Sequence, residues 1–328
     1  MLLRGKIRKA LAFMGLLSVC ICGGAGAEYP DRTIQLMIGF DAGGSEDLRA
    51  RALVSKLGEV LGQPVVVMNK PGASGSVALS LLAKAKPDGY TLGSASASPV
   101  LFVPHVQKVE YNPLTDFTYI CGSAVQPLGI VVKSDAPWNT FNELVEYVEK
   151  NPGKLKYGTF GIGGGAHVYM ELVGKSRNLN WVHVPFKGDQ PTVNALLGGH
   201  IPVAVSPSTF VPHVRGGKLK LLAMATESRS SAFPQVPTLK ELGFNLDFRA
   251  FGDVLGYLGP KGLPPGIVKK LEDAFKKAVE SPDFQQIMEN LTNDKRYRDS
   301  REFTKMIHEV YPRTGQMIAQ LGISQTTK

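Results

Sequence analysis

An apolar run that ends in a glycine pair and continues as a helical pattern constrains this fold more than any other stretch. Residues 34–40 are apolar except for Gln35, and the run is short enough for a buried strand. The run breaks at Gly43 and Gly44, after which apolar residues recur at helical spacing from Leu48 to Leu57. We therefore expect a strand, a glycine turn and a helix, whose free N–H groups and positive dipole end can bind an anion.

The same turn also has a purely structural interpretation. Ser45 can cap the helix, and Glu46 and Asp47 in the first turn already complement the helix dipole. The Gly-Lys-Ser sequence at 174–176 is not a nucleotide-binding loop, because Tyr169 stands where G-x-x-x-x-G-K-[ST] requires glycine. If the turn binds an anion, we therefore expect a carboxylate rather than a phosphate.

The first 27 residues have the pattern of a secretory signal peptide. Four basic residues precede an uncharged, mostly apolar run at 10–22, and small residues at 25–27 precede Glu28. The run is shorter than the ~20 residues that cross a bilayer, which argues against a permanent membrane anchor. We expect cleavage before Glu28 and a periplasmic product.

Removal of this segment changes what the composition indicates. It takes away four basic and no acidic residues, so the formal net charge falls from +9 to +5. The remaining charges are scattered, and the lysine pairs at 269–270 and 276–277 lie on a helical pattern, so no nucleic-acid partner is expected. Cys121 is then the single cysteine, and we expect it to be a small buried residue without an intramolecular disulfide.

Strands and helices are predicted to alternate along the first half of the chain. Strands are expected at 34–40, 64–69 and 90–93, with helical patterns between them. Small residues at 94–98 predict a loop that can face a ligand. This alternation predicts a parallel sheet covered on both faces, with ligands at the carboxyl ends of its strands.

The opening pattern occurs again in the middle of the chain. A predicted strand at 155–160 leads into the glycine-rich loop 161–167, then a helix to about residue 175 and a strand at 181–184. The mature chain is longer than one core usually covers, so two lobes are expected. Two glycine turns that face each other across these lobes would form a cleft for a small molecule.

The C-terminal part is predicted to return to the first lobe. Residues 264–322 show helical spacing only, so helices and no further strand are expected there. The return requires crossings between the lobes near 125–133 and near 246–256, which together make a hinge. The expected divisions are a signal peptide at 1–27, the first part of lobe 1 at 28–127, lobe 2 at 128–246 and the return to lobe 1 at 247–328.

Three catalytic or cofactor patterns have weak support. The sequence at 161–166 fits G-x-G-x-x-A, but no acidic residue follows at the distance that dinucleotide binding requires. The six histidines form no H-E-x-x-H pattern, so neither a metal nor a cofactor is expected. A hydrolase or lyase that uses His167 with Asp189 remains an alternative, while His167 also suits a capping or packing role. We expect a binding protein, not an enzyme.

Segments along nearly the whole mature chain resemble the Bug receptors, which are the extracytoplasmic solute receptors of tripartite tricarboxylate transporters. The matching segments are GFDAGGSED at 39–47, GQPVVV at 62–67, PDGYT at 87–91, NPGKL at 151–155, VPFKG at 184–188, LLGG at 196–199 and PQVPT at 234–238. The resemblance implies a type II periplasmic binding-protein fold, in which two α/β lobes close on a small carboxylate. It also implies delivery to the membrane permease subunits of a transporter. Presentation of the ligand to a membrane sensor kinase is the alternative, and a monomer is expected.

The resemblance also implies where a ligand binds. The ligand loops of the family, together with Ser94 from the small-residue loop, give these candidate ligand-binding residues: Phe40, Ala42, Gly43, Gly44, Ser45, Asp47, Ser94, Gly161, Gly164, Gly165, Ala166, His167, Lys187, Gly188, Asp189 and Ser206. The chain departs from the family pattern at Asp41 and Asp189, where small neutral residues are usual, and at 164–166, where hydroxyl side chains are common. The extra acids oppose a second ligand carboxylate unless the ligand carries a cation or the acids point away.

Overall fold

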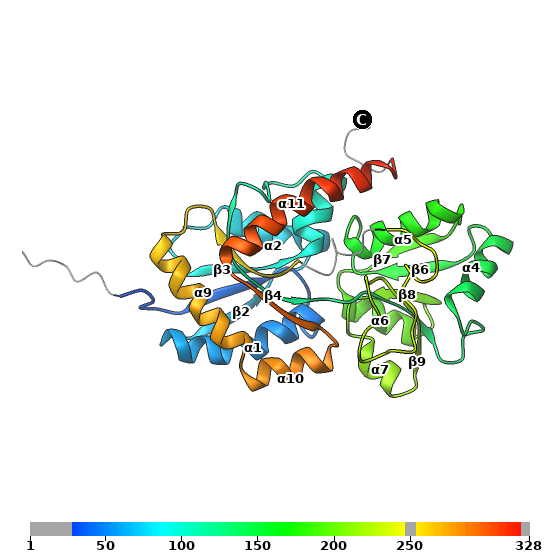
Figure 1. Cartoon of the computed structure of the whole chain (residues 1–328), viewed down its shortest axis with the longest axis horizontal. Helices are drawn as coiled ribbons and strands as arrows, with labels where there is room; N and C mark the ends of the chain where they lie inside the picture. Colours follow the sequence, from blue (N-terminus) through cyan, green and yellow to red (C-terminus); the bar gives the residue numbers. More distant parts are fainter. Residues whose placement is uncertain (1–27, 247–253, 323–328) are drawn as a thin grey trace, which may run out of the picture.

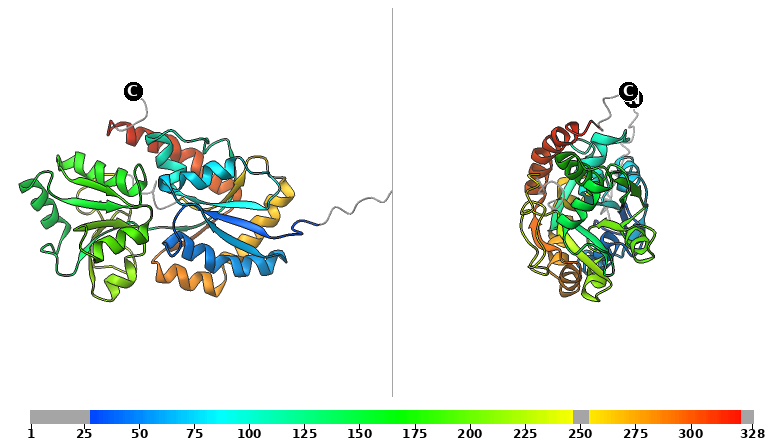
Figure 2. Two further views of the ribbon diagram at one scale, coloured as in Figure 1. Left: turned by 180° about the vertical axis from the view of Figure 1, so that it is seen from behind. Right: turned by 90° about the vertical axis from the view of Figure 1, so that its right-hand side faces the viewer.

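Two α/β lobes lie side by side in the computed structural model, which describes residues 28–246 and 254–322 (Figure 1). Each lobe has its own sheet with helices against it, as the view from behind also shows (Figure 2). The predicted signal peptide and most of the predicted second crossing lie outside the described residues. Within these two ranges no helix is both long and apolar enough to cross a membrane.

The first lobe contains a mixed six-stranded sheet in the order β11-β4-β10-β3-β1-β2. Strand β1 pairs in parallel with β2 and β3, whereas β10 lies antiparallel between β3 and β4. The three strands that were expected to form a parallel sheet, β1, β2 and β3, are parallel, but the sheet as a whole is mixed because β10 runs opposite to its neighbours when the chain returns from the second lobe. The strands are β1 (Ile34–Ile38), β2 (Val65–Asn69), β3 (Thr91–Ser96), β4 (Phe117–Val125), β10 (Leu255–Pro260) and β11 (Asp294–Arg298).

Helices cover both faces of this sheet. Helix α1 packs against α9 and α10, and its Leu53 and Leu57 share a buried cluster with Ile34 and Phe275. Helix α11 packs over β4 and η2 on the other face, where Phe303 and Ile307 are fully buried. The helices are α1 (Ser45–Leu61), η1 (Ala73–Gly75), α2 (Ser76–Ala83), η2 (Ser98–Phe102), α3 (Val103–Val106), α9 (Pro265–Val279), α10 (Pro282–Asn290) and α11 (Ser300–Ala319).

The second lobe contains a five-stranded sheet in the order β7-β6-β8-β5-β9. Strands β6, β7 and β8 are parallel, and β5 is antiparallel to both β8 and β9. Helices α6 and α7 contribute Val193, Leu196 and Val211 to one buried cluster of this lobe. The elements are β5 (Gly129–Lys133), α4 (Phe141–Lys150), β6 (Lys156–Thr159), α5 (Gly165–Arg177), β7 (Val182–Pro185), α6 (Asp189–Leu197), β8 (Val203–Ser206), α7 (Val211–Arg215) and β9 (Leu219–Met224).

The structure confirms the predicted strand, glycine turn and helix at the start of the mature chain, and its repeat before α5. Two other predictions are wrong. Residues 94–96 belong to β3 instead of a loop, because β10 pairs with them. Residues 294–298 form strand β11, although residues 264–322 were expected to be helical; its polar sequence DKRYR suits an edge strand that pairs on one side only. Cys121 is fully buried, as expected.

A chain segment and a helix both connect the lobes. Residues 126–128 link β4 in the first sheet to β5 in the second, within the range predicted for the first crossing. Helix α11 runs along the first lobe and points toward the second (Figure 1), where Lys175 on α5 donates a hydrogen bond to the backbone oxygen of Gln320.

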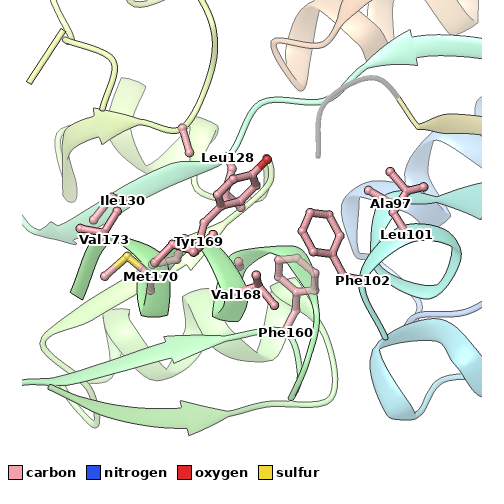
Figure 3. Close-up of a cluster of buried hydrophobic side chains, with 14 of the residues drawn as sticks. Ala97, Leu101, Phe102, Leu128, Ile130, Phe160, Val168, Tyr169, Met170 and Val173 are labelled. Atoms are coloured by element: carbon pink, nitrogen blue, oxygen red, sulfur yellow. The ribbon is translucent and has the colours of Figure 1, made fainter. Parts of the chain in front are cut away.

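An apolar cluster continues from one lobe into the other (Figure 3). The rings of Phe40 and Phe160 make an edge contact at 5.9 Å between centroids, and those of Phe102 and Tyr169 do so at 5.7 Å. Aromatic pairs in this arrangement contribute about 0.5–1.5 kcal/mol beyond the area that they bury. The structure therefore holds the two lobes in a closed arrangement.

Candidate functional site

The first glycine turn brings the start of α1 to the second lobe. Gly43 has a φ of +79°, a conformation that favours glycine. Gly44 is the N-cap residue and supplies no side chain. Ser45 is the first residue of the helix and does not cap it, so the interpretation of Ser45 as a helix cap is wrong. The first N–H groups of α1 are therefore available to acceptors from outside the helix.

Asp47 fixes the shape of this turn. Its Oδ2 accepts hydrogen bonds from the Gly43 N–H at 2.9 Å and from Arg51 Nε at 2.8 Å, and its Oδ1 accepts one from Asn69 Nδ2 at 2.9 Å. Burial acts to raise the pKa of Asp47, but the bonds from Arg51, Gly43 and Asn69 outweigh burial and lower this pKa. The Asp47 carboxylate is thus engaged by the protein itself.

The second glycine turn brings the start of α5 against the first lobe. Gly161 and Gly163 both have positive φ values, +143° and +71°. The Gly163 N–H donates to Nδ1 of His167 at 3.1 Å, and the Gly165 N–H donates to Ser98 Oγ of the first lobe at 3.2 Å. The N-terminus of α5 is therefore capped from across the cleft.

Asp189 of the second lobe makes the equivalent contact with the start of α1 in the first lobe. It is the first residue of α6, is 5% exposed, and accepts a hydrogen bond from the backbone of Gln190 at 3.1 Å. Its Oδ2 also accepts the N–H of Ser45 at 3.3 Å. A Cβ on Gly44 would lie 2.6 Å from Asp189 Oδ1, so any larger residue at position 44 would displace this carboxylate. A carboxylate of the second lobe thus binds the N-terminus of α1.

These contacts enclose a pocket between the lobes. The volume of this cavity is only about 20 Å³, which has room for about one water molecule. The pocket is tightly closed, and its lining residues are Phe40, Ser45, Glu46, Ser96, Ala97, Ser98, Gln126, Phe160, Asp189 and Pro207.

Glu46 gives the pocket a second buried carboxyl group. It is 7% exposed and accepts a hydrogen bond from the Ser94 hydroxyl. Burial raises the pKa of Glu46 against the opposing effect of Arg49, and the charge of Asp189 raises it further. Burial also raises the pKa of Asp189, and the bonds from Ser45 and the charge of Arg49 act against it. Arg49 is 2% exposed and donates to Asn293 Oδ1 at 3.3 Å.

Part of the predicted ligand set meets at this pocket. Phe40, Ser45 and Asp189 line it directly. Four other predicted ligand-binding residues lie next to residues that line the pocket. Gly44 lies beside Asp189, Gly164 and Gly165 lie beside Ser98, and Ser94 lies beside Glu46. The sequence-based set did not include Glu46, Ser96, Ala97, Ser98, Gln126, Phe160 and Pro207. Except for Glu46, which lies in the first turn of α1, these residues lie at the ends of β3, β4, β6 and β8, and this position was the available signal because parallel strands collect ligands at their carboxyl ends.

The other predicted residues lie elsewhere. Gly161 and Lys187 line an exposed groove of about 510 Å³ that also contains Asp41 and Ser74. Ser206 is fully buried and bonded to Thr209 Oγ1 at 3.1 Å. The remaining placements are Ala42 and Gly43 exposed on the first turn, Asp47 in that turn, Ala166 buried on α5, and Gly188 as the N-cap of α6.

His167 and Asp189 contact different groups, so the pair required by the enzyme alternative is not assembled. The His167 ring stacks on His183 with 4.0 Å between centroids, and its Nε2 lies 4.0 Å from Glu171 Oε1. Burial lowers the pKa of His167, with Glu171 acting against it. Burial and then the charge of His167 lower the pKa of His183 to about 3. His167 is a packing residue of the second lobe.

Proteins similar to this chain include known binding proteins. The chain matches the sequence model of the tripartite tricarboxylate transporter family receptor over residues 49–323. A Cupriavidus necator protein, described as a UPF0065 protein in the gbd 5' region, is 37% identical over 322 residues, which cover 98% of this chain and 97% of that protein. The solved structure of the periplasmic binding protein BugD is 29% identical with a TM-score of 0.83, and the match covers 90% of this chain and 99% of BugD.

Two further solved structures contain carboxylates. MatC from Rhodopseudomonas palustris, with bound malate, is 26% identical with a TM-score of 0.80, over 88% of this chain and 100% of MatC. The R. palustris protein Rpa4515, with adipate, is 25% identical with a TM-score of 0.84, over 90% of this chain and 99% of that protein. The family match and the two-lobed fold agree over most of the chain. This protein therefore belongs to the receptor family of the tripartite tricarboxylate transporters, the periplasmic binding proteins that include the Bug receptors.

Proposed function

We propose that this protein is exported to the periplasm, captures a small carboxylate in the pocket between its lobes and presents it to the membrane subunits of a tripartite transporter. The observation that carries the proposal is the contact between Asp189 and the Ser45 N–H. It places a carboxylate at the N-terminus of α1, where backbone donors and the helix dipole favour an anion.

The pocket has the other properties that a carboxylate receptor needs. Phe40 and Phe160 give it apolar walls from opposite lobes, and Ser98 and Gln126 add polar groups that can orient a ligand. The neighbours with malate and adipate support a carboxylate as the ligand class. Because the pocket is tightly closed, a ligand enters only when the lobes separate, and its contacts with both lobes then favour closure.

The proposal includes the division of the chain at 127/128 and at 246/247. The first boundary is supported by the sheets, since β4 belongs to the first sheet and the next strand, β5, belongs to the second. Residues 126–128 then serve as one hinge segment. The signal peptide is supported by the charge and apolar pattern of residues 1–27.

A thermal-shift screen of the mature protein with mono-, di- and tricarboxylates and with amino acids tests the function. A ligand at ~100 times its Kd adds about 2.7 kcal/mol to the free energy of unfolding, which raises the melting temperature measurably. Ser98→Leu fills the pocket and is expected to abolish the shift. Ser55→Leu, on the exposed side of α1, is the matched control and is expected to keep it. If no carboxylate shifts the wild-type protein, the proposed function is wrong.

A further inference from the structure

We infer that the ligand of this receptor carries a cationic group as well as a carboxylate, and that Glu46 and Asp189 hold the cationic group from opposite lobes. The ligand class is then a zwitterion such as an amino acid or an amino-alkyl carboxylate, not a plain dicarboxylate. The inference rests on the proposed function, because it specifies the ligand of the same pocket.

The first support is the position of the two acids. Glu46 lies in the first turn of α1 and Asp189 in the first turn of α6, and both side chains line the pocket. They are 7% and 5% exposed. A group that binds both carboxylates would touch both lobes, and its binding would therefore stabilise the closed arrangement.

The second support is the balance of buried charge. Two acids line the pocket, and its lining contains no lysine or arginine. Arg49 lies behind the lining, 2% exposed, and its charge acts on both carboxyl groups. One guanidinium balances one of the two carboxylates, so a negative charge is left over when both are ionised. A buried charge without a partner is strongly unfavourable.

This excess of negative charge favours ligands with an ammonium group over dicarboxylates. A dicarboxylate would bring a second negative charge next to Glu46 and Asp189, which opposes binding. An ammonium group supplies the missing positive charge and three donors. Burial raises the pKa of both carboxyl groups, and a cationic group bound between them would lower both pKa values and so favour the ionised forms.

The third support is an unused acceptor in the pocket. Ser96 lines the pocket and is 5% exposed. Its hydroxyl acts as a donor to Glu46 and lowers the pKa of that carboxyl, while its oxygen accepts no hydrogen bond from the described part of the chain. Buried hydroxyl groups are normally hydrogen-bonded. A ligand ammonium between the two acids would supply a donor to this oxygen.

Calorimetry with matched ligand pairs tests the inference. Each pair shares one carboxylate and one chain length, and the far end is either a carboxylate or an ammonium, as in succinate and 4-aminobutanoate or glutarate and 5-aminopentanoate. Pairs of a monocarboxylate and its 2-amino derivative cover amino acids. The wild-type protein is expected to bind the best ammonium ligand about tenfold to a hundredfold more tightly than its partner, the range of a charge-assisted hydrogen bond.

Two shape-preserving variants, Glu46→Gln and Asp189→Asn, are expected to lose about tenfold to a hundredfold in affinity for the ammonium ligands only. Asp41→Asn is the matched control, because Asp41 lies in the exposed groove outside the pocket, and it should leave the preference unchanged. Asp189→Ser, which keeps an oxygen for the Ser45 N–H, replaces Asp189→Asn if that variant does not fold.

The outcomes are distinct. Tighter binding of the dicarboxylate in every pair would overturn the inference and leave the proposed function intact. A preference for ammonium ligands that survives both substitutions would overturn the roles of Glu46 and Asp189. Failure of every carboxylate, with or without an amino group, would instead contradict the proposed function.

Discussion

At the scale of single residues, Asp47 links three separate parts of the first lobe, since its carboxylate binds the glycine turn, the next turn of α1 and Asn69 at the end of β2. Hydrogen bonds to a charged group contribute about 1.5–3 kcal/mol each when they are well formed. The side chain is nearly inaccessible, at 2% exposure, so solvent does not replace these bonds. Asp47 therefore holds the shape of the turn that leads into the site.

Asp47→Asn is expected to lower the free energy of unfolding by about 1–3 kcal/mol at neutral pH. The pKa of Asp47 is lowered in the folded protein. Its contribution is therefore present above the unfolded pKa of about 3.9 and is lost as the pH falls through the folded value. Urea unfolding at pH 7 and pH 3 should show a smaller difference at pH 3, with the exposed Asp283→Asn as control. Equal differences at both pH values would contradict this role.

The stacked histidines predict acid sensitivity of the second lobe. His183 has a folded pKa of about 3, against about 6.5 when unfolded. Since the unfolded chain binds the proton more strongly, stability should fall as the pH drops from about 6.5 toward 3. His183→Gln should lose less stability than the wild-type protein over this pH range. The control His308→Gln, at an exposed position, should lose as much stability as the wild-type protein. Denaturant midpoints measured at a series of pH values would show this smaller loss of stability in His183→Gln. Parallel curves of midpoint against pH for all three proteins would contradict the prediction.

At the scale of elements, the loop before α5 determines how closely the lobes approach. The backbone oxygen of Ile162 accepts hydrogen bonds from Ser74 Oγ at 2.9 Å and from Gln107 Nε2 at 2.8 Å, both in the first lobe. A Cβ on Gly161 would lie 2.1 Å from Ser74 Oγ. Glycine at 161 is therefore needed for closure as well as for the turn.

Gly161→Ala is expected to weaken ligand binding by favouring separated lobes. Gly199→Ala is a matched control, since Gly199 also has a positive φ, +74°, but a Cβ there would meet no atom within 4 Å. The φ of +143° at Gly161 is less accessible to alanine than the φ of +74° at Gly199, so the separation of the lobes, and not the loss of stability, reports the clash. Small-angle scattering should give a larger radius of gyration for Gly161→Ala alone. The same radius for both variants would exclude this role of Gly161.

The elements that sequence patterns predicted are those with a strong local signal. The apolar run before Gly43 and the helical spacing after it predicted β1 and α1, and the repeat at 155–175 predicted β6 and α5. Strand β11 was missed because its polar residues pair on one side only. The antiparallel direction of β10 depends on how the chain returns from the second lobe, which local periodicity does not contain.

The same distinction holds for the site. The two glycine turns were predicted, because glycine marks them in the sequence. The contact between Asp189 and Ser45 joins residues 144 positions apart, and no spacing rule relates them. Glu46 was interpreted only as a complement to the helix dipole, since its direction into the pocket depends on the packing of α1 against both lobes.

At the scale of the whole molecule, side chains from both lobes line one pocket between the lobes. Apolar contacts such as Phe102 with Tyr169 hold the lobes together, while Asp189 and Ser98 each cap a helix of the opposite lobe. A ligand carboxylate can replace such a cap only when the lobes open. The family relationship and this geometry together account for a receptor that encloses its cargo before delivery.

The most direct test of this account is a crystal structure of the mature protein with the tightest-binding carboxylate from the thermal-shift screen. The ligand is expected between Phe40 and Phe160, with its carboxylate within hydrogen-bond distance of first-turn N–H groups of α1 or α5. The lobes should enclose it as they enclose the pocket here. A ligand bound instead in the exposed groove beside Lys187, with the pocket between the lobes unchanged, would contradict it.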